Sequence, residues 1–205
     1  MKNILNITNG DNAVGIMKKV NIAGVFLPWQ DVLHDGPVPA KLSLEGLSEV
    51  RAQFIIERRW GTPENIRKSF VERDSELKSF GKYEKIILWF EHDLYDQLQI
   101  LQILDWFHSN PSRGIELSII CTEKYIGRLA PDEMKDLLGY EELITKNHLT
   151  LFSSAWSAFR SSSPEKWFGL LNTDTSALPF LEGAIVRLLE EYPNCSNGLS
   201  RTARQ

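Results

Sequence analysis

The sequence predicts an α/β fold: a parallel sheet of about four strands with flanking helices, followed by a C-terminal helical segment. Two observations predict it. Short apolar runs alternate with longer stretches of helical spacing across residues 3–121, an order typical of strands and helices that follow one another. One run, Ile86–Phe90, contains five consecutive apolar residues, which is typical of a strand covered on both faces, as in a parallel sheet.

The first elements predict a β-α-β unit. Residues 3–8 alternate between polar and apolar side chains and predict a strand that ends at a turn signal. Asp11 or Asn12 can cap the helix that follows, which runs to about residue 20. Residues 25–27 predict the second strand. Units of this kind normally pair their two strands in parallel.

A loop and two helices follow the second strand. Two prolines and a glycine exclude a helix from residues 29–39, and a loop of this length is more often functional than idle. Helical patterns then cover residues 43–60 and 63–79. Thr62 is expected to cap the second helix, which begins with a proline, a residue favoured at the first helical position.

The next elements complete the sheet. Residues 84–90 and 115–121 predict the third and fourth strands, and a helix starting at Asp93 lies between them with a turn at 110–114. The resulting order, β-α-β-α-α-β-α-β, predicts a parallel, Rossmann-like sheet. We assign residues 1–139 to this α/β domain.

The rest of the chain has a helical pattern. The expected helices cover residues 131–138, 145–160, 164 onward and 178–192. A composition shift after residue 139 predicts a helical segment over 140–197, packed on or beside the sheet. Residues 198–205 predict the start of a further, truncated helix, with Ser200 as its cap.

Composition excludes several classes of protein. The formal net charge of −4 argues against broad electrostatic binding of nucleic acid. Cys121 and Cys195 suggest neither a disulfide framework nor a CxxC metal site. The sequence shows no signal-peptide pattern and no apolar run of about 18 residues, so we expect a cytoplasmic protein that does not bind membranes.

Polar side chains gather where the predicted strands end. They are Asn9, Gly10 and Asp11 after the first strand, Asp31, His34 and Asp35 after the second, and Glu91, His92, Asp93 and Gln97 after the third. Parallel strands end on one edge, where open α/β sheets bind their ligands. We therefore expect a cleft with His34, Asp35, Glu91 and His92 as catalytic residues. The other residues of the group would bind the ligand: Asn9, Gly10, Asp11, Asp31, Asp93 and Gln97.

Three uses of this cleft stay open. Glu91, His92 and His34 could hold a divalent metal such as Mg²⁺, Mn²⁺ or Zn²⁺. A carboxyl group whose pKa is raised by neighbouring carboxylates could work with a histidine as general acid and base. The cleft could also recognise hydroxyl or amino groups of a ligand. No HExxH, GxGxxG, GxSxG or Walker A sequence occurs to decide between them.

Structural roles compete with these functional ones. Asp11 and Asp93 each precede a helix, so capping is the alternative for both. Asp31 can form a local turn with its own backbone. His34–Pro37 has the composition of a plain tight turn.

A cationic residue is expected to complete the cleft. Trp156 and Arg160 are spaced four residues apart on one predicted helix, so the guanidinium can stack on the indole. With this helix facing the cleft, Arg160 would meet a phosphate or carboxylate of the ligand. A surface cation–π pair is the alternative.

Three segments resemble a known family. They are ITNGD at residues 7–11, LPWQDVLHDGPVP at residues 27–39 and LWFEHDLYDQL at residues 88–98. Together they resemble the bacterial domain-of-unknown-function family numbered 1835, over about residues 4–125. AWSAFR at 155–160 and LPFL at 178–181 resemble the helical segment that follows that domain. The resemblance implies a bacterial cytosolic protein and carries no activity with it.

These observations lead to one expected function and two alternatives. The strand-end cleft is expected to bind a small polar or phosphorylated ligand, in a metal-assisted hydrolase or transferase. The first alternative is a non-catalytic module that senses a ligand and carries a nucleic-acid-binding extension missing from this chain. The second is a structural adaptor with tryptophans at its interface.

Overall fold

The computed structural model describes residues 3–111 and 114–204 and confirms the α/β fold. The sheet has the strand order β2-β1-β3-β4-β5. Its strands are β1 (Ile4–Thr8), β2 (Val25–Pro28), β3 (Lys85–Glu91), β4 (Glu116–Thr122) and β5 (Glu142–Leu143). The four expected strands are parallel, whereas β5 pairs with β4 in the antiparallel direction. The sequence does not predict β5, because two residues are too few to show alternation.

Helices connect and follow these strands. They are α1 (Asp11–Lys19), α2 (Leu44–Glu57), α3 (Pro63–Lys78), α4 (Leu94–Ser109), α5 (Pro131–Asp136), α6 (Lys146–Phe159), α7 (Pro164–Gly169) and α8 (Leu181–Leu189). Thr62 and Asp93 cap α3 and α4 as predicted. The expected cap of α1 is wrong: Gly10 holds that position, and Asp11 is the first helical residue. Within the described ranges, no helix is long and apolar enough to cross a membrane.

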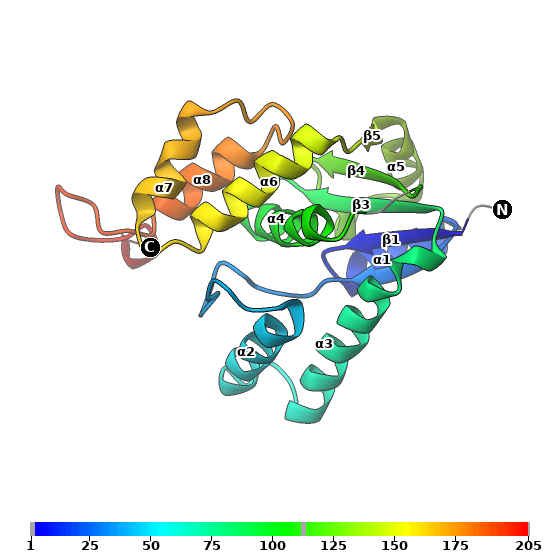
Figure 1. Cartoon of the computed structure of the whole chain (residues 1–205), viewed down its shortest axis with the longest axis horizontal. Coiled ribbons are helices and arrows are strands. Elements are labelled where there is room, and N and C mark those ends of the chain that lie inside the picture. Colours follow the sequence, from blue (N-terminus) through cyan, green and yellow to red (C-terminus); the bar gives the residue numbers. More distant parts are fainter. Residues whose placement is uncertain (1–2, 112–113, 205) are drawn as a thin grey trace.

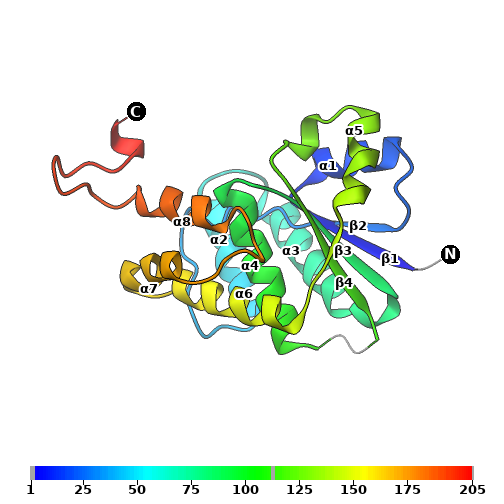
Figure 2. The same cartoon turned by 90° about the horizontal axis from the view of Figure 1, so that it is seen from above.

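The two faces of β3 explain why its apolar run is unbroken. Ile87 and Trp89 pack into a cluster with residues of α1 and α5. Ile86, Leu88 and Phe90 point to the opposite face and join the larger core, which includes residues of α4. Figure 2 shows α1 and α5 on one side of the sheet and α4 on the other. The sheet is therefore buried between two layers of helices.

The C-terminal helices pack on α4. Phe152 and Trp156 from α6 and Ile185 from α8 belong to the same core as the sheet, and Figure 1 shows both helices beside α4. The expected truncated helix at the end of the chain is a short 3₁₀ turn, Thr202–Arg204, with Ser200 accepting the amide of Ala203. Residues 112, 113 and 205 of the expected elements lie outside the described residues.

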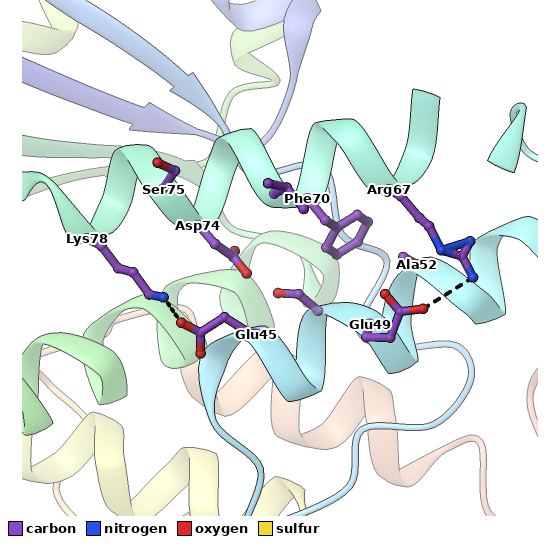
Figure 3. A pocket seen from close by; sticks show the side chains of 10 residues that line it. Glu45, Glu49, Ala52, Arg67, Phe70, Asp74, Ser75 and Lys78 are labelled. Atoms are coloured by element: carbon purple, nitrogen blue, oxygen red, sulfur yellow. Dashed lines mark ion pairs between the residues drawn. The ribbon is translucent and has the colours of Figure 1, made fainter. Parts of the chain in front are cut away.

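Helices α2 and α3 form a hairpin beside the sheet (Figure 1). Ala52, Ile55, Ile66 and Phe70 make a small apolar cluster between them. Figure 3 shows the hairpin from close by, with two ion pairs that join the helices, Glu45 with Lys78 and Glu49 with Arg67. A cavity of about 270 Å³ lies between these pairs.

A glycine allows β2 to pair closely with β1. Gly24 has a φ of +121°, and a Cβ there would lie 2.6 Å from the carbonyl oxygen of Ile4. We expect Gly24→Ala to lower the free energy of unfolding by about 1–3 kcal/mol, because of this clash and the strained backbone. Gly183→Ala is the control: its Cβ meets nothing within 4 Å, so stability should not fall. Urea denaturation measures both, and equal effects would contradict the prediction.

Candidate functional site

A cavity of about 490 Å³ lies at the carboxyl edge of the sheet, where β1 and β3 end. Five of the expected residues line it: Asn9, Gly10, Asp11, Glu91 and Asp93. Seven further lining side chains come from neighbouring loops and helices: Asn12, Gln30, Tyr95, Asp96, Gln99, Tyr125 and Arg128. The backbone thus brings together residues that are far apart in sequence, because the strands are parallel and end side by side.

Two carboxyl groups and one amide form the centre of this cavity. The Asn9 Nδ2 group donates to Glu91 Oε1 and to Asp96 Oδ2, each at 3.2 Å. Asp96 Oδ2 also accepts the backbone N–H of Glu91 at 2.6 Å, and Glu91 Oε1 accepts that of Ile126 at 2.8 Å. A strand end, a helix start and a loop therefore meet at one pair of carboxyl groups.

Burial changes the protonation of this pair. Asp96 is 3% exposed and Glu91 is 5% exposed. Burial, opposed in part by the N–H of Glu91, raises the pKa of Asp96 to about 8, with smaller contributions from the nearby charges of Asp93 and Glu91. Burial is also the largest cause that raises the pKa of Glu91. At neutral pH, Asp96 therefore keeps its proton.

The rim of the cavity is mostly acidic. Asp11 Oδ2 accepts from Gln30 Nε2 at 2.6 Å, so its carboxylate joins the start of α1 to the loop after β2. Asp93 caps α4 by accepting the amide of Asp96 at 3.1 Å. Arg128 is the cation among the lining residues, and its guanidinium lies 5.5 Å from the ring centroid of Tyr125. Carboxylates therefore outnumber cations in the lining.

The two expected histidines each lie one aromatic ring away from the cavity. The ring centroid of His34 is 3.9 Å from that of Tyr95, and the centroid of His92 is 5.5 Å from that of Tyr125. Both tyrosines line the cavity, whereas neither histidine does. Burial lowers the pKa of His34. The histidines therefore support the walls of the cavity and are not among its lining residues.

The two aspartates of the second strand end hold the loop after β2. Asp31 is fully buried and its carboxylate accepts from Arg51 Nε at 2.9 Å. Arg51 also donates to the carbonyl oxygens of Val32, Asp35 and Pro37. The Asp35 carboxylate pairs with exposed Arg58 at 3.5 Å. Neither aspartate lines the strand-end cavity, because the loop turns both toward α2.

Gln97 fixes the end of β3 from behind the cavity. Its Nε2 group donates to the carbonyl oxygen of Glu91 at 2.8 Å and contacts the Sγ atom of Cys121 at 3.4 Å. Burial raises the pKa of the Cys121 thiol to about 12, so this cysteine stays a thiol and is a poor nucleophile. Gln97 thus positions the strand end and is not among the lining residues.

Trp156 and Arg160 stack as the spacing predicts, with the guanidinium 4.7 Å from the indole centroid. The expectation that they face the strand-end cleft is wrong. Both line a separate cavity with Asp105 and Trp106, residues of the last turns of α4, whereas the strand-end cavity lies at the first turn of that helix. Helix α6 packs along α4 and presents this pair at the opposite end.

The expected metal ligands do not form a cluster. Among residues 3–111 and 114–204, no group of three or more His, Cys, Asp or Glu side chains is placed to hold a metal ion. The Oε1 atom of Glu91 accepts from Asn9 and Ile126, and His34 and His92 lie behind tyrosine rings. Glu91, His92 and His34 are therefore not arranged around one point as the ligands of a single metal ion.

Asp96 is the central residue that the sequence does not single out. The sequence contains only a weak indication of its role. Asp96 follows the helix cap Asp93 by three residues, a spacing that places both at the first turn of α4. Asp93 is therefore both a cap, as the alternative reading proposed, and a lining residue.

Comparison of the chain with protein-family models, with curated proteins and with solved structures gives no match. The likeness to the family numbered 1835 stays an expectation from the sequence. Function has to be argued from the geometry of the site.

Proposed function

We propose that the strand-end cavity binds a small polar ligand by hydrogen bonds to the hydroxyl or amino groups of that ligand. We further propose that Asp96 and Glu91 exchange a proton with the ligand. One observation carries this proposal: the amide of Asn9 bridges two buried carboxyl groups, one of which keeps its proton at neutral pH. Carboxyl groups with such raised pKa values are concentrated at functional sites.

The charges of the lining favour particular ligand groups. Asp11, Glu91 and Asp93 offer acceptor oxygens, which suit the hydrogen-bond donors of hydroxyl and amino groups. The same carboxylates would repel the two negative charges of a bare phosphate. Arg128 is the single cation among the lining residues that could offset this repulsion. A cavity of about 490 Å³ is within the size range of small-molecule sites.

The carboxyl pair also supports catalysis. A general acid or base works best when its pKa lies near the working pH, and the pKa of Asp96 is about 8. A protonated Asp96 can donate to a leaving group while Glu91 accepts a proton from an attacking hydroxyl. This is the chemistry of a hydrolase or transferase that uses two carboxyl groups in different protonation states.

The test is a thermal-shift series at pH 7 with ribose, adenosine, putrescine and ribose 5-phosphate. A bound ligand at 100 times its dissociation constant adds about 2.7 kcal/mol of stability, or roughly 5–10 °C for a chain of this length. We expect a shift with at least one uncharged or cationic probe, a smaller one with ribose 5-phosphate than with ribose, and no shift in Glu91→Gln.

Glu84→Gln is the matched control. Glu84 is exposed and precedes β3, so it lies at the opposite edge of the sheet from Glu91. This variant should respond to ligands like the wild type. The proposal is wrong if Glu91→Gln also responds like the wild type, or if ribose 5-phosphate stabilises the protein more than ribose does.

A further inference from the structure

A second cavity, of about 550 Å³, lies at the far end of α4. It is enclosed by the start of α2, the last turns of α4 and the end of α6. The side chains that matter here are Gln102, Asp105, Trp106, Trp156 and Arg160. None of them lines the strand-end cavity, so the two cavities are separate.

Two residues that line this second cavity each carry a buried donor without a partner. Within the described ranges, eight buried side-chain atoms lack a hydrogen-bond partner, and two of these can only donate: Gln102 Nε2 and Arg160 Nε. Both residues, Gln102 and Arg160, line the same cavity. Because an unpaired buried donor costs about 1–3 kcal/mol, two of them in one place indicate a site for acceptor atoms.

The orientation of the Gln102 amide is fixed by its neighbour. Gln102 is 4% exposed, and its Oε1 atom accepts from Trp29 Nε1 at 2.8 Å. An indole N–H can only donate, so a reversed amide would place two donors against each other. The Nε2 group must therefore point away from Trp29.

Arg160 supplies a positive charge that its neighbours neutralise only in part. Its side chain is 15% exposed, and Oδ2 of Asp105 lies 3.9 Å from its Nη2 atom, beyond hydrogen-bonding distance. That carboxylate accepts a shorter bond from Ser153 Oγ at 2.7 Å. The guanidinium is stacked on Trp156, which holds its plane in a fixed direction.

The remaining walls define the chemical class of the ligand. Phe80 and Trp106 line the cavity and pack edge to face with centroids 5.3 Å apart, so the body of the ligand meets aromatic surface. Asp105 and Glu45 also line the cavity, as does Lys78, which pairs with Glu45. With Arg160, the lining therefore carries two acidic and two basic side chains, and it offers no excess of positive charge to a doubly charged phosphate. From these contacts we infer that this second cavity binds a small aromatic monocarboxylate, with its carboxylate on Arg160 and Gln102 and its ring against Phe80 and Trp106.

Isothermal titration of the whole chain with phenylacetate, phenylacetamide and inorganic phosphate tests this inference. A hydrogen bond to a charged group is strong enough that one such contact changes affinity about tenfold. We expect phenylacetate to bind at least about tenfold more tightly than phenylacetamide or phosphate, with a change in tryptophan fluorescence from Trp106 and Trp156. Arg160→Gln should remove this preference. Gln102→Glu, which keeps an acceptor for Trp29, should weaken binding of phenylacetate.

Arg58→Gln is the matched control. Arg58 also lies near a carboxylate, at 3.5 Å, and over an aromatic ring, at 5.1 Å, but it is exposed and lines neither cavity. This variant and Glu91→Gln should bind phenylacetate like the wild type. The inference is overturned if phenylacetate does not bind, if phenylacetamide or phosphate binds equally well, or if Arg160→Gln keeps the wild-type affinity. Loss of binding in Glu91→Gln would contradict the separation of the two cavities.

Discussion

Replacement of Arg51 by methionine is expected to lower the free energy of unfolding by about 3–5 kcal/mol, since it leaves a buried carboxylate without its partner. Arg51 and Asp31 are both fully buried, and the guanidinium Nε donates to the carboxylate at 2.9 Å. The same guanidinium also donates to three carbonyl oxygens of the loop after β2. Its loss should therefore loosen residues 32–37 as well. Urea denaturation measures the stability, and hydrogen exchange measures the loop.

Two further variants separate the ion pair from a general effect of losing an arginine. Asp31→Asn combined with Arg51→Met should recover part of the loss, because no unpaired charge then stays buried. Arg58→Met, which removes an exposed partner of Asp35, should cost less than about 1 kcal/mol. If Arg51→Met costs no more than Arg58→Met, the proposed role of the buried pair in holding the loop is wrong.

Asp96→Asn is expected to stabilise the protein at alkaline pH. The folded state raises the pKa of Asp96 from 3.8 to about 8, so it holds the proton more tightly than the unfolded state does. The contribution of Asp96 to the stability of the wild type should be largest below about pH 4, fall as pH rises, and be lost above about pH 8. The full difference corresponds to roughly 6 kcal/mol. Asparagine has no proton to lose, so the advantage of the variant should grow from pH 5 to pH 9.

Urea denaturation at pH 5, 7 and 9 measures this divergence. Asp136→Asn is the control, because Asp136 is an exposed residue at the end of α5. Its stability should follow that of the wild type at every pH. Parallel curves for the wild type and Asp96→Asn would show that Asp96 titrates alike in the folded and unfolded states.

The sequence predicts the elements of the fold whose signals are local. The apolar run of β3 and the caps Thr62 and Asp93 depend only on nearby residues, and the structure confirms them. Strand β5 has no such signal, because its two residues are set by pairing with β4. Helical spacing likewise predicts that Arg160 stacks on Trp156. It does not predict which cavity the pair lines, since that depends on how α6 packs on α4.

In the candidate site, too, some residues can be predicted from the sequence and others are placed only by tertiary packing. The parallel order of the strands predicts that Asn9 and Glu91 lie at one edge. In the structure, Asn9 Nδ2 lies 3.2 Å from Glu91 Oε1. Burial of Asp96 could not be predicted, because a carboxylate in the first turn of a helix is normally exposed and stabilises the helix dipole. The positions of His34 and His92 behind tyrosines also depend on tertiary packing. Composition and spacing therefore predict which edge of the sheet holds the site. Which residues line the cavity at that edge depends on tertiary packing.

The most direct test of the proton-bearing carboxyl pair is a ¹³C NMR titration of the aspartate side-chain carboxyl groups. We expect one resonance, absent from Asp96→Asn, to titrate near pH 8, as the raised pKa of Asp96 requires. A ligand that hydrogen-bonds to the pair should shift this titration. If every aspartate carboxyl group titrates below about pH 5, near the ordinary value for this side chain, then no aspartate holds a proton at neutral pH. The proposed proton exchange at the strand-end cavity would then be wrong.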